Sequence, residues 1–299
     1  MTDSFAPLRP LVFSIAYRML GSVAEAEDIA QETLLRAHRQ AAEGTDVVSP
    51  KAYITSIAMR LAIDHLRLAR VRRETYVGPW LPEPLLVDES ADVARAAELS
   101  DSLSMAFLVL LERLAPVERA VFLLREVFDY DYAEIAGVVG KSEDNCRQIL
   151  TRARRRVAVE RPRFEASRAA RDALAERFFA AAQEGDLDGL VEMLAADAVF
   201  TGDGGGKATA FPRPIDGRDR VAKLVAGIFR KARAVGVRFE AAQINGQPGA
   251  LVRDPSGALV NTLVLDIADG VVLGVRSVIN PDKLGHLGPV SALARKKER

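Results

Sequence analysis

The stretch 202–214, GDGGGKATAFPRP, holds a glycine run and a lysine of the kind that cradles phosphate groups. A phosphate-binding loop of that type needs Gly, four residues, then Gly-Lys followed by Ser or Thr. Thr201 occupies the first of these positions and Ala208 the last, and the prolines that follow prevent a helix from starting directly behind the loop. The sequence therefore favours a loop whose glycines let the backbone approach another surface. A flexible connection between a strand and a helix is the alternative.

Acidic side chains in the same half of the chain are candidate bases. Asp197, Asp203 and Asp266 lie among apolar residues, while His286, the last of three histidines, follows the final expected strand. This set gives weak support for catalysis, so we expect no enzyme and regard binding of a small molecule without turnover as the better alternative. No His/Cys cluster has the spacing of metal ligands, and we expect neither a metal nor a cofactor.

Residues 132–156, YAEIAGVVGKSEDNCRQILTRARRR, have the pattern of a helix-turn-helix. Gly140 permits the turn, and Ser142 is placed to cap the second helix. Residues expected to pack between the helices are Ile135, Val139, Cys146 and Ile149. The face left for DNA carries Ser142, Glu143, Arg147, Gln148, Thr151, Arg152 and Arg155. A helical hairpin with a solvated basic face is the alternative.

A long helix expected from Ser49-Pro50 to about Arg73 carries a second basic face. Along one side it presents Tyr53, Ser56, Arg60, Asp64 and Arg67. An aromatic ring with hydroxyl and cationic neighbours suits single-stranded DNA, because unpaired bases stack and phosphates need cations. A solvated basic face would have the same composition. The preceding helix, which begins after Ser22, has an outward face made of Asp28, Gln31, Glu32, Leu35 and Arg36. An exposed leucine among acids indicates a protein contact.

These elements belong to a chain of 299 residues with zero net charge and one cysteine. The composition is that of a soluble globular protein in a reducing compartment, and neither a leader nor a membrane span is expected, which predicts a cytoplasmic location. Residues 74–101 are rich in proline and acids and read as a linker. Trp80 and Leu81 are unusual in a free linker, and we expect them to dock.

The order of elements predicts helices in the first half and an α+β arrangement in the second. Expected helices cover 7–20, 22 onward, 50–73, 102–114, 116–127, 132–139, 143–159, 167–183, 187–195 and 218–234. Strands are expected at 235–244 and 250–253, followed by a hairpin with Asp269-Gly270 at its tip.

Three motifs in order, AEDIAQETLLRAHR, YITSIAMRLAIDHLR and the helix-turn-helix ending RARRR, resemble extracytoplasmic-function (ECF) sigma factors of bacterial RNA polymerase. The resemblance implies that Asp28, Gln31, Glu32 and Leu35 contact core polymerase, which such factors bind through its clamp and flap. It places the face from Tyr53 to Arg67 at the −10 element of promoter DNA and the helix-turn-helix at the −35 element. Met59-Arg60 stands where many members have Arg-Asn, which leaves the preferred −10 base open.

Residues 167–290 resemble a SnoaL-like domain, a cone of curved, mostly antiparallel sheet with helices over its mouth. A group of sigma factors carries this domain, and the resemblance implies that it regulates the sigma part through an intramolecular contact. The shared motifs comprise Trp80, Leu81 and Pro82; Asp203, Gly204, Gly205, Gly206 and Lys207; and Asn280, Pro281, Asp282, Lys283 and Leu284.

The expected organisation is therefore multidomain. A sigma-2 domain (1–73), the linker (74–101) and a sigma-4 domain (102–162) precede the SnoaL-like domain (167–290) and a tail (291–299). The rival interpretation is a DNA-binding regulator whose C-terminal domain binds a small ligand; it predicts no polymerase-dependent initiation.

Overall fold

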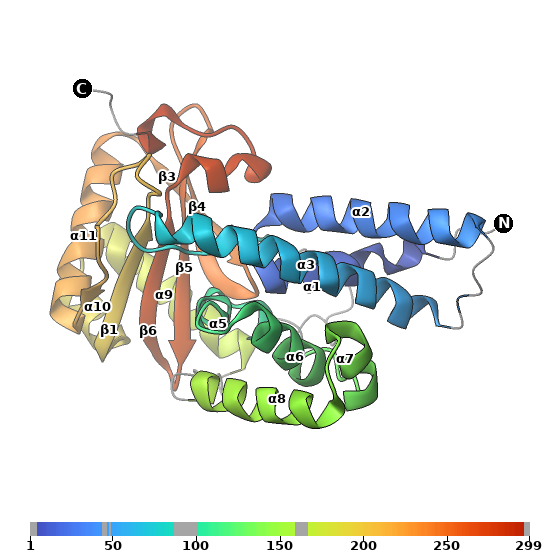
Figure 1. Cartoon of the computed structure of the whole chain (residues 1–299). Coiled ribbons are helices and arrows are strands. Elements are labelled where there is room, and N and C mark those ends of the chain that lie inside the picture. Colours follow the sequence, from blue (N-terminus) through green and yellow to red (C-terminus); the bar gives the residue numbers. More distant parts are fainter. Residues whose placement is uncertain (1–4, 44–46, 48, 87–100, 159–166, 296–299) are drawn as a thin grey trace. The chain divides into compact units, whose positions relative to one another are not determined.

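The computed structural model describes residues 5–43, 47, 49–86, 101–158 and 167–295 (Figure 1). The chain divides into two compact units, the first formed by residues 1–75 and 107–161 and the second by 76–106 and 162–299. The linker residues 76–86 thus belong to the second unit. None of the described helices is long and apolar enough to cross a membrane.

The N-terminal helices of the first unit begin and end at residues whose types favour caps. They are α1 (Arg9–Leu20), α2 (Val23–Ala42) and α3 (Pro50–Glu74), with a short 3-10 turn, η1 (Ala6–Leu8), before α1. Gly21 ends α1 in the left-handed conformation, with φ of 66°. The hydroxyl of Ser22 accepts from the backbone N–H of Glu25, and that of Ser49 accepts from Ala52. These helices agree with the sequence prediction.

The second group of helices in this unit contains the helix-turn-helix. Its members are α5 (Met105–Leu111), α6 (Pro116–Glu126), α7 (Tyr132–Val139) and α8 (Glu143–Ala158). Asp131 and Glu134 form a capping box at the start of α7, and Gly140 ends it with φ of 66°. The core expectation needs one correction, because Val138 is buried where Val139 was expected and Val139 is half-buried. Ile135, Cys146 and Ile149 are buried as predicted.

The helix expected over 102–114 is shorter than predicted. A 3-10 turn, η2 (Asp101–Leu103), precedes α5, which ends at Leu111. The next residues tighten into i to i+3 bonds, with Leu114 N–H donating to the Leu111 carbonyl at 3.0 Å. Pro116 disfavours the helical region only at Ala115, which is extended and begins the next helix, so it does not explain why α5 ends at Leu111.

The two helical groups pack against each other in the first unit. The hydroxyls of Thr55 on α3 and Tyr130 after α6 form a buried hydrogen bond of 2.7 Å. The guanidinium of Arg119 on α6 is buried, donates to the Met19 carbonyl at 2.6 Å and pairs with Glu112 at 2.7 Å. A buried cation with two strong acceptors fixes α1 and α6 in one arrangement.

The second unit is built on a six-stranded sheet of order β2-β1-β6-β5-β4-β3. Its strands are β1 (Leu194–Asp203), β2 (Ile215–Asp216), β3 (Arg238–Ile244), β4 (Gln247–Arg253), β5 (Leu259–Ala268) and β6 (Val271–Val278). β1 and β6 run parallel and the other neighbours antiparallel. Irregularities in the β1–β6, β4–β5 and β5–β6 ladders bend the sheet. Its architecture is the predicted curved, mostly antiparallel sheet.

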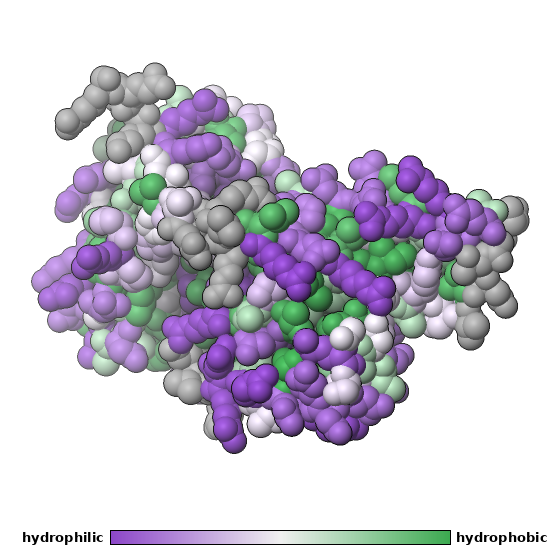
Figure 2. All heavy atoms as spheres, viewed as in Figure 1, coloured by the Kyte–Doolittle hydropathy of each residue, from purple (hydrophilic) through white to green (hydrophobic). Residues whose placement is uncertain are grey.

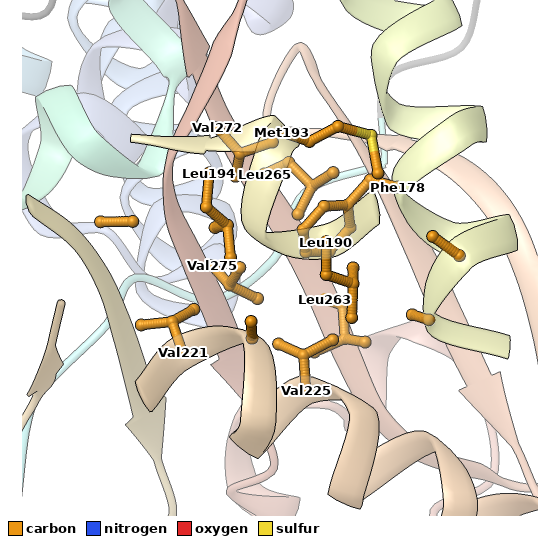
Figure 3. Packing of buried hydrophobic residues seen from close by; sticks show 14 of the residues in the cluster. Phe178, Leu190, Met193, Leu194, Val221, Val225, Leu263, Leu265, Val272 and Val275 are labelled. Atoms are coloured by element: carbon orange, nitrogen blue, oxygen red, sulfur yellow. The ribbon is translucent and has the colours of Figure 1, made fainter. Parts of the chain in front are cut away.

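One face of the sheet is covered by α9 (Arg168–Glu184), α10 (Leu187–Met193) and α11 (Arg218–Ala234). Figure 3 shows the core between them, with Phe178 and Leu190 from the helices meeting Leu263, Leu265 and Val275 from the strands. Side chains alternate along a strand, so Asp203 points away from the face that buries Phe200. This alternation places Asp203 where the linker lies.

The segment after β6 is ordered by short 3-10 turns. These are η3 (Pro281–Lys283), η4 (Gly285–Leu287) and η5 (Ala292–Ala294). Ser291 donates its backbone N–H to Leu259 and its hydroxyl to Asp254. Residues 291–295, expected in the tail, are therefore held against the sheet.

Candidate functional site

A buried polar cluster holds the linker on the sheet of the second unit. We name its members Tyr76, Leu81, Asp203, Asn280 and Lys283 the linker latch. Asp203 is fully buried at the end of β1. Its Oδ2 accepts from the Leu81 N–H at 2.8 Å and from the Lys283 Nζ at 2.7 Å, and its Oδ1 accepts from the Tyr76 hydroxyl. One carboxylate thus joins β1, the linker and the segment after β6.

Lys283 is the cationic half of the latch. Its ammonium is buried, donates to the Leu81 carbonyl as well as to Asp203, and lies 4.5 Å from the Trp80 ring centroid and 4.9 Å from that of Tyr76. Two aromatic faces and a carboxylate compensate for its lost hydration. Trp80 is therefore in contact with Lys283, which agrees with the expectation that this side chain docks.

Backbone and side-chain contacts of Asn280 complete the latch. The N–H groups of Ile279 and Asn280 donate to the Asp203 carbonyl at 2.9 and 3.0 Å, and Asn280 Nδ2 donates to the Tyr76 oxygen at 2.9 Å. Burial, and after it the charge of Asp203, raises the pKa of Tyr76 well above its usual value. The phenol accordingly stays protonated and remains a donor to the carboxylate.

The glycine loop lies directly against the linker. Gly205 has φ of 55°, and a Cβ there would stand 2.2 Å from Asn280 Nδ2 and 2.9 Å from the Tyr76 oxygen. At Gly206, with φ of 73°, a Cβ would meet Val77 at 3.2 Å. Only glycine fits this backbone at that distance. Lys207 pairs with Asp282 in an exposed ion pair, so the loop and the segment after β6 are also joined.

A second anchor follows along the linker. Leu85 donates to Asn245 Oδ1 at 3.0 Å and accepts from the Asn245 N–H at 2.7 Å, while Asn245 Nδ2 reaches the Leu103 carbonyl at 3.0 Å. His286 Nε2 lies 2.7 Å from the Pro84 carbonyl oxygen. Sequence reasoning missed Tyr76, Asn245 and His286 as members of this contact.

The predicted −35 residues lie on one exposed surface. Ser142, Glu143, Arg147, Gln148, Thr151, Arg152 and Arg155 are all exposed, and Figure 2 shows hydrophilic side chains gathered over α8. Arg147 is held by Glu143 and Asp144 at 2.9 Å each and lies 4.7 Å from the Tyr132 ring centroid. Arg152 and Arg155 form no ion pair with the described residues. Burial raises the pKa of the Cys146 thiol, which agrees with a core residue rather than a reactive one.

A hollow between α2 and α3 collects three of the predicted −10 residues. Tyr53, Arg60 and Asp64 line a cavity of about 390 Å³ together with Arg36 and Arg39 of α2. Ser56 and Arg67 do not line it. Arg36 was predicted on the outward face of α2 but not at this hollow, and Arg39 was missed, although their spacing of three residues on one helix is a signal for a shared face.

Arg60 also contacts the helix-turn-helix. Its Nη2 donates to the Gly137 carbonyl at 2.8 Å and its Nε to the Val138 carbonyl at 3.1 Å, at the end of α7. Both donors point at a helix C-terminus, where unpaired carbonyls carry partial negative charge. Part of this guanidinium is therefore occupied by protein in the described arrangement.

The surface of α2 predicted to contact polymerase is accessible. Asp28, Gln31 and Leu35 are exposed. Glu32 is half-buried and pairs with Arg36 at 2.6 Å.

The candidate acids differ in burial and in partners. Asp266 is buried and pairs with Arg276 at 2.7 Å, and burial, opposed by Arg276, raises its pKa. Asp197 is exposed, and Asp203 is used by the latch. Within the described residues, no group of three His, Cys, Asp or Glu side chains could hold a metal ion.

Comparison with known proteins gives three family matches. Residues 5–72 match Sigma-70 region 2, residues 104–157 match Sigma-70 region 4, and residues 175–260 match the SnoaL-like domain. The chain is 35% identical to the ECF RNA polymerase sigma factor SigJ of Mycobacterium tuberculosis over 94% of its own length and 92% of the relative's. It is 31% identical to the probable ECF sigma factor SigI of the same species, covering 93% of each.

The fold agrees with a solved relative. The crystal structure of Mycobacterium tuberculosis SigJ superposes with a TM-score of 0.77 at 32% identity, covering 97% of this chain and all of that one. The helix-turn-helix, the basic helix α3 and these matches define a transcription factor. The chain belongs to the ECF RNA polymerase sigma factors and carries a SnoaL-like domain after its two sigma regions.

Proposed function

We propose that the SnoaL-like domain controls this sigma factor through the linker latch. The supporting observation is the buried pair of Asp203 and Lys283, which together bind both backbone groups of Leu81. Leu81 lies in the segment that connects sigma region 2 to region 4. Whatever holds this segment also limits how far the two regions can separate.

The distance between promoter elements makes such a limit relevant. The −10 and −35 elements are about 25 base pairs apart, or roughly 85 Å of duplex at 3.4 Å per base pair. Fixing residues 76–86 on the sheet removes at most about 35 Å from the length over which the linker can be drawn out. Opening the latch would therefore shift the population of arrangements that can reach both elements.

The residue roles in DNA and polymerase binding are part of the same proposal. The hollow lined by Tyr53, Arg60 and Asp64 has the ring and the cations that an unpaired −10 base and its phosphates need. The exposed face of α8 offers Arg152 and Arg155 to the −35 duplex. Asp28, Gln31, Glu32 and Leu35 would contact the polymerase clamp and region 4 its flap, in the cytoplasm.

Run-off transcription with core polymerase tests the proposal. The full chain is compared with the Trp80→Ala and Lys283→Met variants and with a chain cut near Pro162. We expect the latch variants to change promoter output severalfold, and the sign of the change tells which arrangement the latch favours. Unchanged output from folded latch variants and from the shortened chain would refute control by the SnoaL-like domain. If the intact wild-type chain does not initiate transcription with core polymerase, the sigma assignment is refuted instead.

A further inference from the structure

Helix α11 carries a large share of the positive charge of the second unit, and the linker latch makes no use of it. Six Lys or Arg residues and one Asp lie on this helix. The rest of residues 167–290 holds nine Lys or Arg and fourteen Asp or Glu. The charges of this domain are therefore balanced in sum, while one helix concentrates the cations.

Four of these cations share the side of α11 that points away from the sheet. The buried residues of the helix are Val221, Ala222, Val225 and Phe229. Figure 3 shows Val221 and Val225 pointing from α11 into the core. At about 100° per residue, the opposite side of the helix is occupied by what we name the α11 basic face: Arg220, Lys223, Gly227, Arg230 and Lys231. Its four cationic residues are exposed.

The charges of the α11 basic face are not compensated within the described part of the chain. None of its four cationic side chains forms an ion pair with a described residue. Asp219 precedes Lys223 by one turn, which is the spacing of a helical ion pair, yet the two side chains do not pair. Arg220 and Lys223 are three residues apart, a spacing at which like charges repel each other. A bound polyanion would remove this repulsion.

Gly227 leaves a gap in the middle of this face. A Cβ at 227 would meet nothing within 4 Å, so packing inside the protein does not require a glycine there. Glycine in the interior of a helix is less favourable than alanine, because its backbone loses more conformational freedom on folding. Without a side chain at 227, another molecule can approach the helix closely between the cations.

The cations form two groups whose separation suits duplex DNA. Arg220 and Lys223 lie before Gly227, and Arg230 and Lys231 lie after it. The midpoints of the two groups are roughly 13 Å apart along the axis, at 1.5 Å per residue. The major groove of B-DNA is about 12 Å wide. A helix laid across the groove can therefore bring one group of cations to the phosphates on each side of it.

The composition of the face favours DNA over an acidic protein. Protein interfaces have a centre rich in aromatic and apolar residues and are depleted in lysine, whereas the centre of this face is a glycine between Lys and Arg residues. We propose that the α11 basic face binds the phosphate backbone of duplex DNA without reading its sequence. The SnoaL-like domain would then add a DNA contact to those of the two sigma regions. This contact does not depend on the latch.

Fluorescence anisotropy of a labelled duplex, titrated with the full-length chain at several salt concentrations, tests this contact. Arg230→Gln should weaken binding severalfold at low salt and reduce the slope of log affinity against log salt by about 0.9, and adding Lys223→Gln should double that reduction. Both losses should be equal on a promoter duplex and on one with scrambled −10 and −35 elements, because phosphate contacts carry no sequence information. Arg177→Gln, which removes an exposed arginine from α9, is the matched control and should change neither quantity.

A variant of Gly227 separates DNA binding from folding. Gly227→Gln fills the gap with a neutral side chain, so it should raise the midpoint of thermal unfolding and yet weaken DNA binding. Ala173→Gln adds the same side chain to the exposed side of α9 and should leave binding unchanged. Wild-type affinity and salt slope in both Arg230→Gln and Gly227→Gln would show that the face is merely solvated. If these variants instead weaken binding to core polymerase and not to DNA, the partner is an acidic protein surface, and the proposal is equally overturned. Neither result bears on promoter output from the latch variants.

Discussion

Arg60 donates a hydrogen bond of 2.8 Å to the carbonyl oxygen of Gly137. The first residue lies on the helix proposed to read the −10 element and the second on the first helix of the helix-turn-helix. The two elements proposed to reach DNA sites roughly 85 Å apart are thus joined in one compact unit. The proposed function therefore requires this arrangement to open before both elements bind one promoter.

Loosening this arrangement without touching a DNA-binding cation should favour initiation. Thr55→Val removes the bond to Tyr130 and leaves a buried hydroxyl unsatisfied, at a cost of about 1–3 kcal/mol. We expect higher promoter output in run-off transcription from Thr55→Val and lower output from Arg60→Ala, which also removes a cation proposed to bind phosphate. A folded Thr55→Val protein with reduced output would contradict a closed resting arrangement.

The pair of Asp203 and Lys283 should be strongly coupled. Removing one partner leaves a buried charge uncompensated, so Asp203→Leu and Lys283→Met should each lower the free energy of unfolding by about 3–5 kcal/mol. The double variant should lose clearly less than the sum, as measured by denaturant unfolding. Lys207→Met is the matched control, since its exposed pair with Asp282 is worth about 1 kcal/mol or less. Additive losses would mean that the two side chains act independently.

Gly205→Ala should disturb the latch through sterics. The alanine must keep the φ of 55° that Gly205 has, and its Cβ would lie 2.2 Å from Asn280 Nδ2. Gly257→Ala is the matched control, because its φ is 87° and a Cβ there meets nothing within 4 Å. The control should lose only the left-handed backbone penalty of about 1–2 kcal/mol. Equal losses in thermal unfolding would show that Asn280 and Tyr76 yield freely to a side chain at 205.

The predictability of these features depends on the range of the interactions. Helix α11 follows from the helical spacing of its apolar residues and the hairpin at Asp269-Gly270 from local turn chemistry, and both were predicted. Strand β1 was not, because Leu187, Leu190 and Leu194 continue a helical spacing across the junction with α10. No glycine or proline marks the change there.

Every latch member except Tyr76 was predicted to lie at the interface, but the pairing between them was not predicted. The resemblance placed Asp203, Lys207 and Lys283 at one interface. Which of the two lysines pairs with the Asp203 carboxylate depends on where β1 ends and on the path of the segment after β6. Asn245 carried a misleading signal, since Asn-Gly in a hairpin indicates a turn residue, whereas its side chain also binds Leu85. Tyr76 lies beside the prolines of the linker, where composition indicates no partner.

Stability at high pH should depend on Tyr76. Its pKa is raised in the folded chain, so the unfolded chain loses this proton first, and the contribution of Tyr76 is complete below about pH 10 and declines as the pH rises above it. The decline should approach about 1.4 kcal/mol per pH unit. Chemical unfolding of the wild type and Tyr76→Phe at pH 8 to 11 measures it as a difference, which cancels the other tyrosines. A constant difference across this range would contradict a half-buried phenol bound to the Asp203 carboxylate.

The recognition face of α8 should respond unequally to loss of its arginines. Arg147 must break ion pairs with Glu143 and Asp144 before it can bind DNA, whereas Arg152 has no such pair among the described residues. Arg152→Ala should therefore weaken binding to a −35 duplex more than Arg147→Ala.

Removing one cation that binds a phosphate should reduce the slope of log affinity against log salt by about one. Fluorescence anisotropy at several salt concentrations measures both the affinity for the duplex and its dependence on salt. The double variant, Arg147→Ala with Arg152→Ala, should abolish −35-dependent transcription. Glu240→Ala is the control variant. It removes an exposed ion pair between Glu240 on β3 and Arg253, both far along the chain from the helix-turn-helix. If Arg152→Ala keeps both the affinity and the salt slope of the wild type, α8 does not present this face to the duplex.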